Sequence, residues 1–262
     1  MVTRHKKVPE DDRQPGKWLV VRLLLVLLLV YWQPVAALEE GTRPAPEGAT
    51  SRSPVEQAVG RTFMVVTAHP LASEAAALAL RVGGSAVDAA IAAQLVLTLV
   101  EPQSSGIGGG ALMLHFDGRT VRAFDGRETA PKAAREGMFL NADGTPVAFM
   151  EAVVGGRSGG VPGVLRLLEM VHRRFGRLPW ADLFLPAIRL AEEGFPVSPR
   201  LHALLARERH LPGDAAARAY FYRHDGSPWP VGTVLKNPAL AAVLRQLADH
   251  GADAFYTGAI AR

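Results

Sequence analysis

The chain has 262 residues, with 29 Lys and Arg against 25 Asp and Glu, which gives a formal net charge of +4. Hydrophobic residues make up 48% of it and charged residues 21%, so the composition excludes a disordered or collagen-like chain and favours one folded domain or two small ones. The chain has no cysteine, which excludes a disulfide framework, a thiolate metal site and a cysteine nucleophile.

The excess positive charge lies mainly in the leader. Residues 1–37 hold six basic and three acidic side chains, a net charge of +3, and the remainder carries only +1. Lys132 and Lys236 are the two lysines that follow this leader. Because electrostatic binding of DNA or RNA needs positive charge clustered on the folded body, we expect no nucleic-acid partner.

Residues 1–37 have the three-part layout of a secretory signal peptide. A polar, basic stretch precedes the apolar run 18–32, which contains only Arg22 as a charged residue, and the small residues Val35 to Ala37 follow. We therefore expect cleavage after Ala37 and a periplasmic or extracellular protein. An uncleaved membrane tether is the alternative, although the run is shorter than the roughly 20 residues that span a bilayer.

After the leader, residues 38–60 are rich in turn formers and poor in hydrophobic residues, which predicts a flexible linker before a folded unit at 61–262. Residues 62–66 have strand composition, and Pro70 is expected to stop that strand. A helix is then predicted to open at Ser73 and Glu74. Residues 86–100 form a second predicted helix, capped by Ser85 and apolar on all faces, so we expect it to be buried.

The next segments predict an α+β protein. Residues 111–116 and 119–125 read as two strands joined by a tight turn. Helical spacing of apolar residues, with Gly or Pro near the boundaries, then predicts a mainly helical second half with helices at 161–175, 180–193, 199–209 and 238–250.

Four glycines, Gly106 and Gly108 to Gly110, form a cluster that offers two interpretations. Backbone N–H groups of glycine-rich loops cradle phosphates. This cluster, however, has no Lys-Ser/Thr ending, and it follows a helix and precedes a strand, the reverse of a phosphate-binding fingerprint. Close backbone packing, where a side chain would not fit, is the favoured interpretation.

Arg127 is the candidate ligand-binding residue. It lies in the segment Asp125 to Pro131, at the expected end of a strand. An arginine grips a carboxylate through two parallel N–H bonds, and Asp125 or Glu128 could hold it in one orientation. Loop arginines are commonly solvated, so these residues alone leave both interpretations open.

Five ordered motifs give the chain a resemblance to the gamma-glutamyltranspeptidases. They are G-G-S-A-V-D-A-A at 83–90, E-P-Q-S-S-G-I-G-G-G at 101–110, D-G-R-E-T-A-P at 125–131, G-V-P-G at 160–163 and D-A-F-Y-T-G at 253–258. Ser85 stands where that family usually has asparagine, and Ala111 where it usually has a further glycine. The resemblance runs from about Arg61 to the last residue and identifies the chain as the N-terminal part of the family's large subunit.

This resemblance implies an N-terminal nucleophile (Ntn) hydrolase, of which the chain would form part of the αββα sandwich. The hairpin is expected to have 86–100 on one side and the helices after Val161 on the other. In the family a precursor cuts itself into two subunits, and the new N-terminal threonine attacks the gamma-glutamyl bond of glutathione and other gamma-glutamyl compounds. The acyl group passes to water, an amino acid or a peptide, and no cofactor is implied. Arg127 inherits the role of binding the alpha-carboxylate.

The nucleophile is expected to lie outside this chain. We expect the small subunit to be missing as a partner and the chain alone to be inactive; the alternative is a truncated exported relative that only binds a ligand. The sequence Thr67-Ala68-His69 imitates the family's T-x-H, but it leads into a proline and a helix, so Thr67 is rejected as the nucleophile. The histidines show no metal-binding spacing and are read as solvated or core residues.

Overall fold

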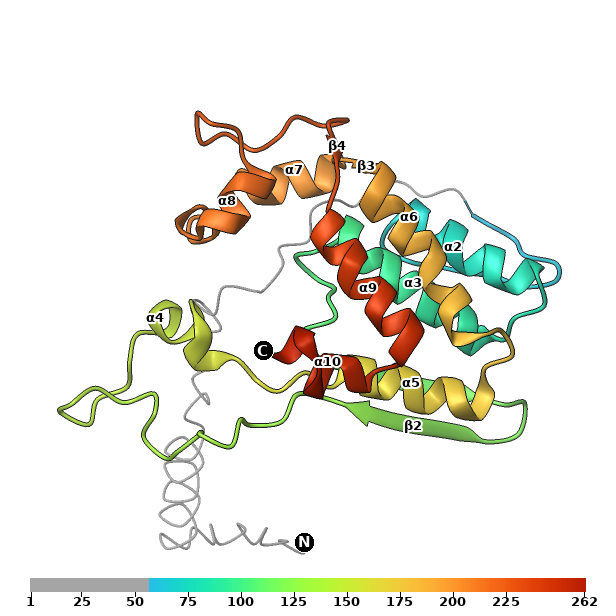
Figure 1. Cartoon of the computed structure of the whole chain (residues 1–262), viewed down its shortest axis with the longest axis horizontal. Helices are drawn as coiled ribbons and strands as arrows, with labels where there is room; N and C mark the ends of the chain where they lie inside the picture. Colours follow the sequence, from blue (N-terminus) through green and yellow to red (C-terminus); the bar gives the residue numbers. More distant parts are fainter. Residues whose placement is uncertain (1–56) are drawn as a thin grey trace, which may run out of the picture. The chain divides into compact units, whose positions relative to one another are not determined.

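Helices packed around one central helix, with a β-hairpin, make up residues 57–262, which are the residues that the computed structural model describes (Figure 1). The predicted signal peptide and most of the linker lie outside the described residues. The elements in chain order are α2 Pro70–Arg81, α3 Ala86–Val100, β1 Ala111–Phe116, β2 Val121–Gly126, α4 Phe149–Val153, the 3-10 turn η1 Gly156–Ser158, α5 Val164–Phe175, η2 Trp180–Phe184, α6 Leu185–Glu193, β3 Phe195–Pro196, α7 Pro199–Leu205, η3 Leu211–Gly213, α8 Ala215–Phe221, β4 Val234–Leu235, α9 Pro238–His250, α10 Asp253–Thr257 and η4 Ala259–Ala261.

Helix α3 is the centre of the core, as its composition predicts. It packs against α2, α5 and α6, and the side chains of Ile91, Leu95 and Val96 are fully buried. Its N-terminus is closed by a capping box, in which Ser85 accepts from the backbone N–H of Asp88 and the Asp88 carboxylate accepts from the backbone N–H of Ser85. A helix that is apolar on all faces has to be surrounded by other elements, and α3 is therefore the helix around which the others pack.

The buried carboxylate of Asp88 also ties α3 to a distant loop. Its Oδ2 accepts hydrogen bonds from the backbone N–H of Ser85 at 2.7 Å and of Arg177 at 2.9 Å. Asp88→Ala removes the buried acceptor and leaves these part-buried donors without a partner, so we expect it to lower the free energy of unfolding by about 2 kcal/mol. Urea unfolding measures the change, with Asp249→Ala on the exposed face of α9 as the control. An equal loss in the two variants would contradict the assigned role.

The start of α2 differs from the prediction. The helix begins at Pro70, three residues before Ser73, because proline fits the first turn of a helix, where its missing N–H is not needed. His69 is the N-cap, and its Nδ1 accepts from the backbone N–H of Leu71 at 3.2 Å. Burial lowers the pKa of His69, which favours the neutral ring that this cap requires.

No strand forms at the predicted segment 62–66, which is described throughout and has no regular structure. Its apolar side chains Met64 and Val66 are exposed. A strand needs a partner for its backbone N–H and C=O groups, and no described strand pairs with this segment. Strand composition alone was therefore misleading here.

Strands β1 and β2 form the predicted hairpin, with Ala111 opposite Gly126 and Phe116 opposite Val121. Helix α5 packs on one face of the hairpin, where Phe175 stacks on His115 with ring centroids 4.1 Å apart. The opposite face is exposed and apolar, since Leu114 is 76% exposed. This arrangement differs from the expected one, because a helix of the second half covers the inner face and no described element covers the outer face.

The second half is helical, as predicted. Helix α9 spans the predicted residues, and the other predicted helices are shorter than expected. The predicted helix 180–193 divides into η2 and α6, α5 begins at Val164, and α7 ends at Leu205. The α+β class is therefore confirmed. Among the described residues, no helix combines the length and the apolar character that crossing a membrane requires.

Candidate functional site

Arg127 directly follows strand β2, and its neighbours fix its backbone and its side chain separately. Its backbone N–H donates to Oδ1 of Asp125 at 2.9 Å, which closes a local turn at the strand end. Its Nε donates to Oε2 of Glu128 at 3.3 Å. The side chain of Arg127 is nevertheless 70% exposed. The sequence left open which carboxylate orients the guanidinium, and the structure assigns that contact to Glu128.

Glu128 remains a carboxylate in this setting. Hydrogen bonding from its own backbone N–H, and next from the Arg127 side chain, lowers its pKa below the usual value. A depressed pKa means that the ionised form, and with it the contact to Arg127, persists at neutral pH and is lost only as the pH falls through that lowered value. Both side chains are partly exposed to solvent, and an exposed ion pair contributes little to the stability of the fold. The contact therefore serves mainly to orient Arg127.

The lack of side chains at Gly110 and Gly160 leaves room for the side chain of Glu128. A Cβ at Gly110 would lie 2.6 Å from Oε2 of Glu128, and a Cβ at Gly160 would lie 2.7 Å from its Cβ. Close packing, as the sequence predicts, therefore explains Gly110. It does not explain Gly106 and Gly108, because a Cβ at Gly106 would meet only an atom 3.9 Å away and one at Gly108 would meet none within 4 Å.

Gly163 brings the start of α5 against the backbone of the Arg127 segment. A Cβ there would lie 2.3 Å from the carbonyl oxygen of Gly126 and 2.6 Å from that of Arg127. The N–H of Gly163 also donates to the carbonyl oxygen of Gly109 at 3.0 Å. Three motifs that are far apart in the sequence thus meet around Arg127.

A fourth motif completes the surroundings. A hollow of about 280 Å³ lies beside Arg127, and its wall includes Leu167, Met170 and Tyr256. The hydroxyl of Tyr256 donates to the carbonyl oxygen of Pro162 at 2.8 Å, and the guanidinium of Arg166 lies 4.8 Å from the Tyr256 ring centroid. Burial raises the pKa of Tyr256, so its hydroxyl stays protonated and remains a donor. The sequence alone predicts no role for Tyr256, although this residue belongs to the motif at 253–258.

This arrangement suits recognition of a carboxylate. Within residues 57–262, the terminal nitrogens of Arg127 have no hydrogen-bond partner, whereas Nε is held by Glu128. A fixed, planar fork with free donors is the geometry that binds a carboxylate with two parallel hydrogen bonds. The site therefore offers binding and orientation of an anionic group.

The other residues considered from the sequence lie apart from this hollow. The hydroxyl of Thr67 donates to the carbonyl oxygen of His69 at 2.8 Å, and Thr67 lines a different hollow between α2 and α3. The first motif, at 83–90, uses Asp88 for the contacts that hold α3. No cluster of His, Asp and Glu with the arrangement of a metal site occurs within residues 57–262.

Comparison with known proteins places these features in a family. The family model described as gamma-glutamyltranspeptidase matches residues 72–262. The glutathione hydrolase proenzyme of Bacillus subtilis is 40% identical over 206 residues, which are 78% of this chain and 35% of that relative. Among solved structures, the gamma-glutamyltranspeptidase of Helicobacter pylori superimposes with a TM-score of 0.73 at 32% identity, covering 79% of this chain and 59% of that one. That of Pseudomonas nitroreducens, complexed with L-DON, gives 0.70 at 37% identity, covering 76% and 58%.

The chain belongs to the gamma-glutamyltranspeptidase family, because the family model matches most of its length and the five motifs occur in order. Its predicted identity as the N-terminal part of the large subunit is confirmed. The chain spans about a third of the length of the curated relatives that it matches.

Proposed function

We propose that this chain supplies the carboxylate-binding part of an enzyme that cleaves the gamma-glutamyl bond of glutathione and related compounds. The observation that carries this proposal is the fork of Arg127, held by Glu128 at 3.3 Å and otherwise free, in a member of this family. Glutathione hydrolase and gamma-glutamyltranspeptidase are the names of its relatives. Amino acids, peptides and water are the proposed acceptors.

In the proposed reaction Arg127 binds the alpha-carboxylate of the glutamyl group and so orients the gamma-amide. A threonine hydroxyl from outside this sequence adds to the amide carbon, and its proton passes to the alpha-amine of that threonine. The amine leaving group departs with a proton, which leaves a gamma-glutamyl ester. Water or an amino acid then displaces the threonine oxygen. Arg127 forms no covalent bond in either step.

The outer face of the hairpin supports the proposal of a larger sandwich. Leu112 and Leu114 on β1 are 69% and 76% exposed, and Phe116 and Val121 are 63% and 62% exposed. Alternating strand residues that are apolar on both faces are typical of a sheet with a layer on each side. We propose that the nucleophile-bearing part of the enzyme provides a second sheet that packs on this face.

Residues 1–262 alone are expected to release no product from a chromogenic gamma-glutamyl amide, because a site that only orients the glutamyl group provides no nucleophile. Co-expression with the remainder of the large subunit and a small subunit that begins with T-x-H is expected to give activity. Activity of the chain alone that Thr67→Ala abolishes would contradict our rejection of Thr67. Ligand binding without activity after this co-expression would instead favour the alternative, an exported binding protein.

We also propose that the protein is exported and that the mature chain begins at Leu38. The small residues before this position, Val35 to Ala37, are typical of a signal-peptidase site. N-terminal sequencing of the exported protein checks this expectation. Recovery of a chain that retains residues 18–32 would contradict cleavage and favour a membrane tether.

A further inference from the structure

Residues 130–160 form an arm that leaves the core beside Arg127 and returns to it. The bridge at its base joins Thr129 and Val161, through N–H···O bonds of 3.2 and 2.8 Å. All of the arm is described, and Val147 is its one buried hydrophobic residue. Because so little apolar surface is buried, backbone hydrogen bonds such as that from Asn141 to Thr145, at 2.7 Å, order the arm.

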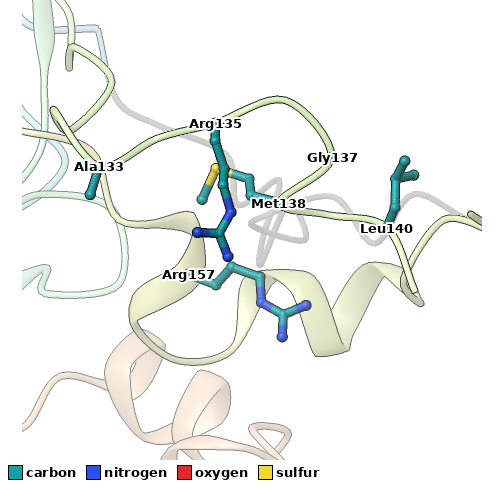
Figure 2. A pocket seen from close by; sticks show the side chains of 6 residues that line it. All are labelled: Ala133, Arg135, Gly137, Met138, Leu140 and Arg157. Carbon is teal, nitrogen blue, oxygen red and sulfur yellow. The ribbon is translucent and has the colours of Figure 1, made fainter. Parts of the chain in front are cut away.

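Two arginines line one hollow of this arm. The hollow measures about 400 Å³. Figure 2 shows the side chains of Arg135 and Arg157, which come from two separate segments, with the Arg135 side chain running toward the segment that carries Arg157 and Met138 beside Arg135. The two arginines are 22 positions apart in the sequence, so the fold of the arm brings them to the same hollow.

Neither cation has a counter-charge within residues 57–262. Arg135 and Arg157 form no hydrogen bond or ion pair there, and Glu136 does not line the hollow although it follows Arg135 in the sequence. Arg173, by contrast, forms an ion pair with Glu169 at 3.3 Å. Two like charges in one hollow repel each other, so an anion between them would be favourable.

Tight turns fix the two backbone positions. The N–H of Met138 donates to the carbonyl oxygen of Arg135 at 3.3 Å, and Gly137 has a φ of +77°, which favours glycine. Arg157 lies in η1, directly after Gly155 and Gly156, and Gly155 has a φ of +96°. The arm therefore presents both guanidinium groups from defined turns rather than from an extended chain.

We propose that this hollow is a second anion site, which binds a small oxyanion of the carboxylate or phosphate type between Arg135 and Arg157. Each guanidinium donates two N–H groups to oxygens of such a ligand. The apolar side chains of Met138 and Leu140 line the same hollow and accept a short carbon chain. The proposed anion site does not include Arg127, so its test does not depend on the proposed enzymatic function.

Titration calorimetry on the full chain at low ionic strength tests the site, with inorganic phosphate and succinate as the probes. Arg135→Gln or Arg157→Gln should weaken binding at least tenfold, since a charged hydrogen bond contributes roughly 1.5 to 3 kcal/mol. The double variant should show no binding. A control variant, Arg119→Gln/Arg218→Gln, removes the same charge from two exposed sites and should bind normally. Equal affinity in all variants, or equal losses in both double variants, would overturn the site.

Binding of one probe only would identify the ligand as a phosphate or a carboxylate, and either result supports the site. Limited chymotrypsin digestion gives a second measurement, because Phe149 in the arm is 57% exposed. The bound probe should order the arm and slow cleavage after Phe149 in the wild-type chain but not in the Arg135→Gln/Arg157→Gln variant. Identical cleavage rates with and without the probe at saturation would contradict the proposal.

Discussion

Replacing Arg127 by lysine is expected to lower kcat/KM on glutathione by about tenfold to a hundredfold in the enzyme completed by the rest of the large subunit and the small subunit, as a charged hydrogen bond contributes roughly 1.5 to 3 kcal/mol. Lysine keeps the positive charge but lacks the planar fork that binds both carboxylate oxygens. The alpha-carboxylate is bound in the ground state and the transition state alike, so most of the loss should be a raised KM.

A matched control exists for this variant. Arg173 is 71% exposed and lies 3.3 Å from Glu169, and Arg127 is 70% exposed and lies 3.3 Å from Glu128. Arg173→Lys makes the same chemical change at an equally exposed arginine and should leave the kinetics unchanged. Unchanged kinetics in Arg127→Lys, with normal folding and processing, would remove Arg127 from the site. A fall in kcat as well would indicate that misplacement tilts the scissile amide.

Gly163→Ala is expected to lower the free energy of unfolding by roughly 3 kcal/mol, the upper part of the range for overpacked sites. Its Cβ would lie 2.3 Å from the carbonyl oxygen of Gly126 and 2.6 Å from that of Arg127. Both atoms are backbone, so relief requires the start of α5 to move away from the strand end. In the completed enzyme the same movement should raise KM, because it displaces Arg127.

Gly156→Ala is the control for this substitution. Gly156 also lies in the chain that leads into α5, but a Cβ there would meet no atom within 4 Å. Thermal or urea unfolding should separate the two variants clearly. Equal stability in both would mean that the contact between Gly163 and the Arg127 segment is looser than the structure has it.

The helices that were predicted well are those whose signals are local. Ser85 caps α3 and Asn237 caps α9, and the apolar residues that follow each cap extend over 15 and 13 residues. Helices α4, α8 and α10 were not predicted, because five to seven residues are too few to show a 3.6-residue period. The cap of α8, where Asp214 accepts from the N–H of Ala217 at 2.8 Å, was a readable signal.

The errors near the start of the described chain have a common origin. Pro70 predicts a stop, but the first turn of a helix accepts proline as readily as a loop does. The composition of segment 62–66 predicts a strand, but strand pairing depends on residues elsewhere. Both predictions depend on which residues pack next to a segment in the folded chain, and a single sequence does not give these neighbours.

At the candidate site, the sequence predicts a binding role for Arg127 but not the contacts around it. It left Asp125 and Glu128 as equal candidates, and only the geometry separates the carboxylate that binds the backbone N–H from the one that binds the side chain. The contact of Gly163 with Gly126 and the contribution of Tyr256 arise between motifs that are far apart in the chain. Such contacts become predictable only when the fold is known.

The outer face of the hairpin also bears on how the protein matures. Leu114 and its neighbours form an uncovered apolar surface next to free strand edges, which is the combination that promotes self-association between copies. Until the proposed second layer docks on this face, correct assembly and aggregation are expected to compete, and the outcome should depend on concentration. We therefore expect production of this chain together with the part proposed to cover the hairpin to raise the yield of folded protein, independently of catalysis.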